Sequence, residues 1–191
     1  MTRRRPPYQL VADVGSVVLI VFILVAYRFL PGGVPGWAFA LAWIVAAAVL
    51  IGVLTELYLF YREYRAGVLF PMRNASLFIL LLSVVGLPVY VAYSVATGQY
   101  LGPSTLLLIP VLLAFATRNL FRVHLDAVTL RAKTGFRSPV EVPLFQLGEV
   151  AVTDDRITIT SSAARPIVLL RAFFFRRHWQ ALVQKLEEVA Q

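Results

Sequence analysis

The stretch NASLFILLLSVVGLPVYVAYSVATGQYLGPSTLLLIPVLLAFAT, residues 74–117, contains no charged side chain and decides the class of fold. A membrane helix needs about 20 apolar residues, because hydrocarbon roughly 30 Å thick is crossed at about 1.5 Å per residue. The stretch is therefore too long for one span and suits two. Its polar, turn-forming segment 97–103 divides it, so we expect spans over about 76–96 and about 104–119.

Two more apolar blocks precede this stretch. One covers about residues 10–30, with Asp13 near its start, and the other covers about residues 36–58 and is uncharged until Glu56. Apolar residues make up 59% of the chain and charged residues 15%, whereas soluble domains average roughly 45–50% and about 25%. These numbers argue against a soluble or a disordered protein and predict four transmembrane helices within residues 1–120.

The arginines of the first 120 residues mark the ends of the apolar blocks and indicate the orientation. Seven of the eight lie before the first block, after the second and after the fourth: Arg3, Arg4, Arg5, Arg62, Arg65, Arg73 and Arg118. The eighth, Arg28, lies near the other end of the first block, where its long side chain can reach the interface. The connections 31–36 and 97–103 carry no charge. The positive-inside rule then predicts a multi-pass protein of the cytoplasmic (inner) membrane with both termini in the cytoplasm. It also explains much of the net charge of +8 without nucleic acid.

The composition changes after residue 120, and the tail 121–191 reads as a separate cytoplasmic domain. Apolar and polar residues alternate over about 128–133 and 156–160, which predicts strands there, and we expect further strands, separated by turn residues, over about 136–142, 147–152 and 166–170. A helical period follows and predicts one apolar face, made of Phe175, Trp179, Leu182, Leu186 and Val189. We therefore expect an α+β membrane protein whose tail is a small barrel of about six strands with a C-terminal capping helix.

Two segments of the tail carry a resemblance to a known family. Residues 142–150 (VPLFQLGEV) and 167–173 (IVLLRAF), followed by a helix with a Trp on its buried face, resemble a bacterial pleckstrin-homology-like (PH-like) domain. The nearest type is the YcxB-like membrane protein, in which transmembrane helices precede such a domain. The resemblance implies a binding fold rather than a catalytic one. It also implies that a basic hairpin, here Arg131, Lys133 and Arg137, can receive an anionic headgroup.

The charges of the last helix run against its dipole. Arg176 and Arg177 lie in its first turn, and Glu187 and Glu188 lie near its end, whereas the helix dipole favours the opposite arrangement. An external anion beside the arginines, from a lipid or an acidic partner, would explain this inversion. The alternative interpretation is a solvated helix face with no binding role.

Residues with catalytic potential are scarce. The chain has no cysteine and two histidines, His124 and His178, both in the tail. Thiolate chemistry and zinc–cysteine sites are thereby excluded, and we expect neither a cofactor nor an enzyme. The acids Asp13 and Glu56 are expected near the cytoplasmic interface, where Glu56 could pair with Arg62, Arg65 or the N-terminal arginines, or where both acids could handle ions.

These observations leave three hypotheses for the function. The first is a non-enzymatic membrane protein whose tail binds protein or anionic lipid, as an accessory or assembly subunit of a membrane complex. Its expected partners are membrane lipids and other membrane subunits or a second copy of the chain, and not nucleic acid. The second is a small transporter or channel that uses Asp13 and Glu56. The third is a membrane-embedded enzyme acting on lipid.

Overall fold

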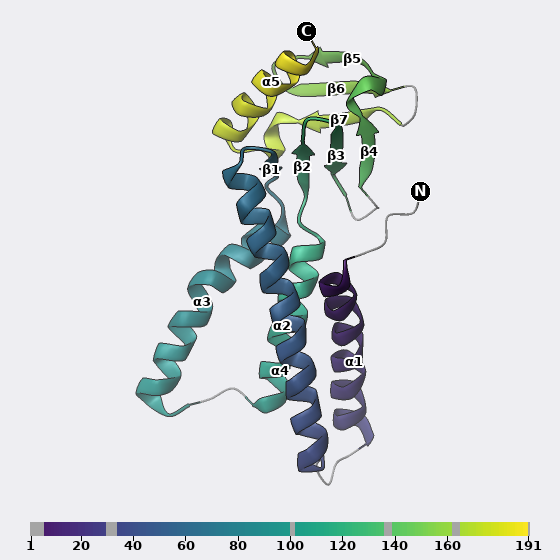
Figure 1. The fold of residues 1–191 in the computed structure, drawn as a ribbon. Coiled ribbons are helices and arrows are strands. Elements are labelled where there is room, and N and C mark those ends of the chain that lie inside the picture. Colours follow the sequence, from purple (N-terminus) through teal and green to yellow (C-terminus); the bar gives the residue numbers. More distant parts are fainter. Residues whose placement is uncertain (1–5, 30–33, 100–101, 136–138, 162–164, 191) are drawn as a thin grey trace. The chain divides into compact units, whose positions relative to one another are not determined.

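The computed structural model describes residues 6–29, 34–99, 102–135, 139–161 and 165–190. These residues form two compact units (Figure 1). The helix unit comprises residues 1–59 and 79–118, and the sheet unit comprises residues 60–78 and 119–191. The sequence placed a boundary between residues 120 and 121, whereas the structure also assigns residues 60–78 to the same unit as the tail.

Four helices account for the apolar blocks. They are α1 (Pro7–Phe29), α2 (Gly36–Arg65), α3 (Ala75–Thr97) and α4 (Pro103–Arg118). Three of them, α1, α2 and α3, are long and apolar enough to cross a membrane. The fourth is apolar but has only 16 residues, a length of ~24 Å at the usual rise. Three of the four predicted spans thus have helices of the required length.

Small residues bring α1 and α2 into close contact. Ala12 of α1 and Ala46 of α2 are buried. A Cβ atom on Gly52 would lie 2.8 Å from the carbonyl oxygen of Tyr8, so the two backbones approach closely at this glycine. Such contacts are typical of membrane helices, which gain little from the hydrophobic effect and associate by close packing.

The sheet unit contains seven described strands in two antiparallel sheets. The first sheet has the order β1 (Leu69–Pro71), β2 (Arg122–Leu125), β3 (Thr129–Lys133) and β4 (Val140–Pro143). The second has the order β5 (Leu147–Val152), β6 (Arg156–Ser161) and β7 (Ile167–Leu170). Short 3-10 helices, η1 (Leu144–Gln146) and η2 (Arg171–Phe173), precede β5 and the C-terminal helix α5 (Arg176–Ala190).

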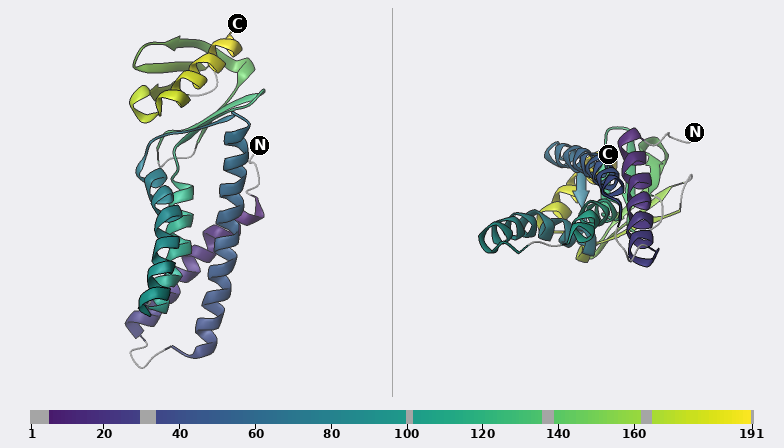
Figure 2. Two further views of the ribbon diagram at one scale, coloured as in Figure 1. Left: turned by 90° about the vertical axis from the view of Figure 1, so that its left-hand side faces the viewer. Right: turned by 90° about the horizontal axis from the view of Figure 1, so that it is seen from below.

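The strands predicted over about 128–133, 147–152, 156–160 and 166–170 and the C-terminal helix are confirmed. Of the strand expected over 136–142, residues 140–142 lie in β4 and residues 136–138 lie outside the described residues, and β2 was not among the predicted ranges. The described strands do not form a closed barrel. They form two sheets instead. In Figure 2, α5 runs beside the sheet of the C-terminal strands, and it contacts β5 and also β1.

Strand β1 was not expected, because three residues between two long helices are too few for a periodic signal. Its residue Phe70 pairs with Val123 of β2 in antiparallel register. Pro71 is compatible with this strand because β1 lies at an edge of the sheet, where a missing N–H breaks no ladder bond. The helices α3 and α4 therefore interrupt the sheet between its first and second strands.

The apolar face of α5 lies in the core of the sheet unit, but Phe175, which was predicted to belong to it, does not. Trp179, Leu182 and Leu186 are buried as predicted. Phe175 is 38% exposed, whereas Phe174 is 4% exposed and its ring centroid lies 5.6 Å from that of Trp179. The helix begins at Arg176, after extended backbone at Phe174. Because extended backbone sends successive side chains to opposite sides, Phe174 replaces Phe175 in the core. The side chain of Val189 lies outside the described part.

Candidate functional site

A charged cluster joins three helices of the helix unit. The guanidinium of Arg118, the last residue of α4, lies 2.9 Å (Nε) from Oδ1 of Asp13 and 3.7 Å (Nη1) from Oε1 of Glu56. The Gln9 amide donates a hydrogen bond to Glu56 at 3.3 Å, and Arg118 donates one to the Gln9 carbonyl at 2.9 Å. Glu56 is only 2% exposed.

The two acids singled out by the sequence are thus brought together, but around a cation that the sequence did not identify as their partner. Arg118 is far from both in the chain, and only the packing of α1, α2 and α4 brings it between them. Arg3, Arg4 and Arg5 lie outside the described residues. A buried carboxylate with an arginine and an amide beside it has the environment of a structural ion pair, which fixes helices against one another.

The basic hairpin predicted to receive a headgroup is partly neutralised. Arg131 and Glu141 lie opposite each other on β3 and β4, and the Arg131 guanidinium lies 2.7 Å from the Glu141 carboxylate. Lys133 is half-buried at the end of β3, and Arg137 lies outside the described residues. The pairing of Arg131 lowers the net positive charge of this hairpin and makes it a weaker candidate for anion binding.

A different group of basic residues lies around the start of α5. Arg176 and Arg177 are exposed, and the first turn of α5 holds no acid. Arg73 is also exposed; its backbone N–H donates to the Phe173 carbonyl at 2.6 Å, and its guanidinium carbon lies 5.5 Å from the Phe175 ring centroid. We call Arg73, Phe173, Phe175, Arg176 and Arg177 together the Arg–Phe surface.

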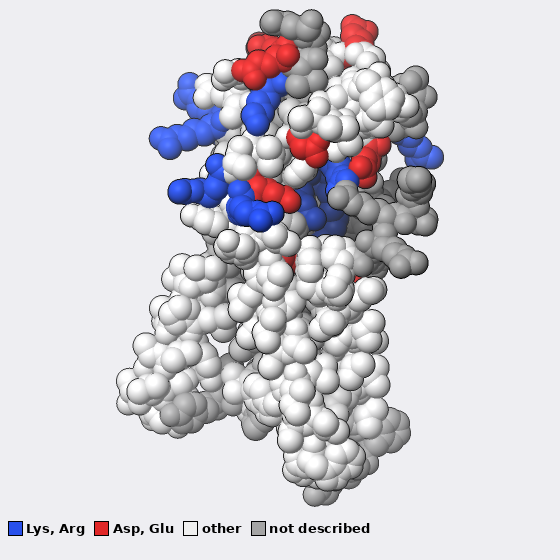
Figure 3. Space-filling model, in the orientation of Figure 1, with Lys and Arg blue, Asp and Glu red and all other residues white. Residues whose placement is uncertain are grey.

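The phenylalanines of the Arg–Phe surface are open to their surroundings, with Phe173 44% and Phe175 38% exposed. Figure 3 shows that Lys and Arg side chains gather over the sheet unit, whereas the visible surface of the apolar helices is almost uncharged. The sequence identified Arg176 and Arg177 as a candidate anion site. It missed Arg73, which is distant in the chain, although three consecutive phenylalanines at 173–175 were a sign of an exposed aromatic group.

Asn74 connects the Arg–Phe surface to the start of α3. Its side-chain oxygen accepts the Leu77 N–H at 3.1 Å, so it caps the first turn of α3. Its amide nitrogen donates to the Asn119 carbonyl at 2.7 Å, just beyond the end of α4. The first turn of α3, Arg73 and the residue after α4 are therefore held together within the sheet unit.

His178 of α5 packs between aromatic rings. Its Nε2 lies 3.2 Å from the Tyr64 hydroxyl, and its ring makes edge-to-face contacts with Tyr64 and Phe175. Burial lowers the pKa of His178 below its usual value, and a hydrogen bond involving the Pro71 backbone opposes this effect. The neutral imidazole is therefore the form that the folded sheet unit favours.

A pH-dependent stability follows from His178. The pKa of His178 is lower in the folded chain than its value of about 6.5 in the unfolded chain. At a pH between these two pKa values, the unfolded chain therefore binds more protons than the folded chain. The free energy of unfolding should fall as the pH drops below about 6.5, by at most about 1.4 kcal/mol per pH unit from this group. Denaturant titrations of the full chain in detergent, followed by tryptophan fluorescence from pH 5 to 8, test this. His178→Gln should reduce the slope, and equal slopes in both proteins would contradict the assignment.

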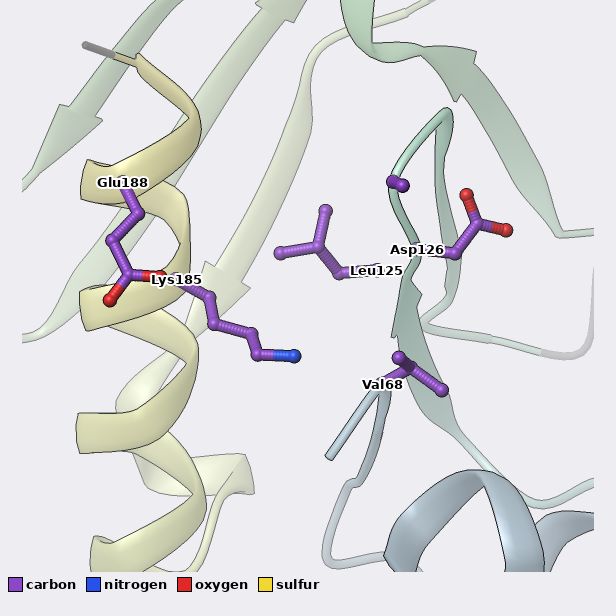
Figure 4. A pocket seen from close by; sticks show the side chains of 6 residues that line it. Val68, Leu125, Asp126, Lys185 and Glu188 are labelled. Carbon is purple, nitrogen blue, oxygen red and sulfur yellow. The ribbon is translucent and has the colours of Figure 1, made fainter. Parts of the chain in front are cut away.

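A shallow cavity of about 270 Å³ lies beside α5, lined by Val68, Leu125, Asp126, Ala127, Lys185 and Glu188 (Figure 4). Two of its charged groups, Lys185 and Asp126, are engaged in the fold. The Lys185 ammonium donates to the Gly67 carbonyl at 2.7 Å. The Asp126 carboxylate, which points away from Lys185 in Figure 4, accepts the N–H groups of Val128 and Thr129 at 2.8 Å each. These hydrogen bonds lower the pKa of Asp126, and the bond from Val128 has the largest effect. The cavity is best explained as the place where α5 is attached to the first sheet.

In the part of the chain that the structure describes, no group of three or more His, Asp or Glu side chains is arranged to hold a metal ion. Comparison of the chain with protein-family models, with curated proteins and with solved structures found no match. Its function has therefore to be argued from its own residues.

Proposed function

We propose that this chain is a non-enzymatic protein of the cytoplasmic membrane, with four transmembrane helices and both termini in the cytoplasm. Its sheet unit is a PH-like module that binds a protein or an anionic lipid at the inner surface. It acts as an accessory or assembly subunit of a membrane complex.

The observation that carries this proposal is the pairing of β1 with β2. Strand β1 comes before α3 and β2 comes after α4, yet they form one antiparallel ladder. If α3 crosses the membrane, the chain has to return to the same side before β2 can pair, so α4 is the returning span. A span of 16 residues is short, but local thinning of the bilayer and flanking polar residues accommodate such lengths at modest cost.

The PH-like interpretation is supported by the strand arrangement. A four-stranded and a three-stranded antiparallel sheet are followed by a helix whose Trp179 is buried. In this interpretation the α3–α4 hairpin is an insertion between the first two strands. A binding role is supported by the exposed arginines and phenylalanines around the start of α5. The arrangement of Asp13 and Glu56 around Arg118 favours helix packing over the transporter alternative.

Co-purification with a matched variant tests the binding role. The full chain and Arg176→Glu/Arg177→Glu would be extracted in mild detergent, and bound proteins and lipids identified by mass spectrometry. We expect the wild type to retain a protein or an anionic lipid that the variant loses. An unchanged tryptophan-monitored melting temperature would show that the exposed substitutions leave the fold intact. Equal recovery of every component from both proteins would contradict a binding role for this surface.

A further inference from the structure

We infer that the Arg–Phe surface (Arg73, Phe173, Phe175, Arg176 and Arg177) lies in the headgroup layer of an anionic membrane, with its phenylalanines at the level of the upper acyl chains. This inference rests on the proposed function and names the partner of that site as lipid. It places the contact at the start of α5 and not at the basic hairpin of β3 and β4.

Arg73 lies next to a helix that is long enough to span a membrane. It precedes Asn74, the cap of α3, and α3 is an apolar helix long enough to span a membrane. A residue just before such a helix lies at the membrane interface by covalent connection alone. The 2.6 Å hydrogen bond from the Arg73 N–H to the Phe173 carbonyl then holds Phe173 at the same level.

The charges of the Arg–Phe surface favour an anionic partner. Among the ion pairs formed by the described residues, none involves Arg73, Arg176 or Arg177. By contrast, Arg131 has Glu141 opposite it. Three exposed arginines beside a helix start whose dipole is also positive repel one another. A layer of anionic phosphates relieves this repulsion. Each basic residue close to the membrane surface contributes roughly 1 kcal/mol to membrane binding, which is about a fivefold change in the binding equilibrium.

The two phenylalanines of the Arg–Phe surface favour a membrane as that partner. Phe173 and Phe175 remain exposed while Phe174 between them fills the core. The Arg73 guanidinium over the Phe175 ring combines a cation and an apolar face in one contact. Arginine beside exposed phenylalanine suits the boundary between headgroups and acyl chains, where the guanidinium binds phosphate and the ring is removed from water.

A fluorescent probe on the full chain tests the inference. The natural chain has no cysteine, so Ala172→Cys, an exposed position in η2, carries a single environment-sensitive label. Phe145→Cys in η1 provides the comparison label on another exposed part of the sheet unit. Both proteins are reconstituted into nanodiscs of phosphatidylcholine alone, or with about one third phosphatidylglycerol. Quenching by lipids that carry a nitroxide near the headgroup reports contact.

We expect the label at 172, and not that at 145, to be quenched in the anionic discs, with less quenching in neutral discs or at high salt. Arg73→Gln/Arg176→Gln/Arg177→Gln should reduce the ratio of docked to undocked molecules roughly 100-fold, about fivefold for each arginine. This variant keeps the hydrogen bond from the backbone N–H of residue 73 to the carbonyl of residue 173. The variant Phe173→Ser, which keeps the contact between the Phe175 and His178 rings, should also lower the quenching while the melting temperature stays unchanged.

Two outcomes would overturn the inference. Absence of quenching at 172 in both lipids would show that the surface does not touch the membrane, and quenching of equal strength in both would show that it does not recognise anionic lipid. Neither outcome bears on the proposed function by itself. If a protein still co-purifies through Arg176 and Arg177, the binding role stands with a protein partner. If nothing does, the proposed function fails as well.

Discussion

A fragment of residues 119–191 is expected not to fold on its own, although it contains six of the seven described strands. The fragment lacks Phe70 of β1 and Met72, which follows β1. Both side chains belong to the core, where they are 4% and 2% exposed. The fragment also loses the hydrogen bond from the Met72 N–H to the Phe121 carbonyl at 2.9 Å. Removing two large core side chains costs about 5–10 kcal/mol, which is comparable with the roughly 5–15 kcal/mol that stabilises a whole domain.

Near-ultraviolet circular dichroism and proton–nitrogen correlation spectra of the fragment measure this. The matched control joins residues 60–78 to residues 119–191 through a flexible linker in place of 79–118. The linker is feasible because Asn74 and Asn119 are hydrogen bonded. We expect the joined chain to give dispersed spectra and a cooperative melting transition. A well-dispersed spectrum from residues 119–191 alone would show that β1 is dispensable.

The second large effect is expected from Arg118→Ala. This change removes the cation beside Asp13 and Glu56 and leaves the buried Glu56 carboxylate without the guanidinium of Arg118. Loss of one partner of a buried ion pair typically costs about 3–5 kcal/mol. We therefore expect a loss of roughly this size in the free energy of unfolding of the full chain, measured by denaturant titration in mixed micelles.

The matched control is the triple variant Asp13→Asn/Glu56→Gln/Arg118→Gln, which replaces the three charges by amides of similar size. Amides carry no charge to desolvate, so this variant should regain most of the stability lost by Arg118→Ala. If Arg118→Ala unfolds like the wild type, or if the triple variant is the less stable of the two, the cluster does not fix the helices as described.

The sequence predicted the parts of this fold that repeat along the chain. Runs without charge indicated the helices, and alternation indicated β3 and β6, because one buried face imposes a period of two. The apolar period of α5 placed Trp179, Leu182 and Leu186 in the core, as they are found. It failed at Phe175, because a helical period extrapolated backwards cannot show that the helix starts one residue later.

The parts that the sequence missed depend on contacts between distant segments. Strand β1 has three residues and no period of its own, so only its pairing with β2 defines it. Asp13 and Glu56 stood out because charge is rare in apolar blocks, but their partner Arg118 looked like one more arginine at a helix end. Arg73 is connected to Phe173 by a hydrogen bond between backbone atoms, and such a bond cannot be predicted from the side chains of the two residues.

In the proposed topology, α3 leaves the cytoplasmic side of the membrane and α4 returns the chain to that side. The direct measurement is labelling of single cysteines in intact cells with an impermeant maleimide, at Gln99 after α3 and at the exposed Val128 before β3. We expect Gln99→Cys to react in intact cells and Val128→Cys to react only after the membrane is opened. Reaction of Val128→Cys from outside, or protection of Gln99→Cys until the cells are opened, would contradict the proposed topology and the role assigned to the sheet unit.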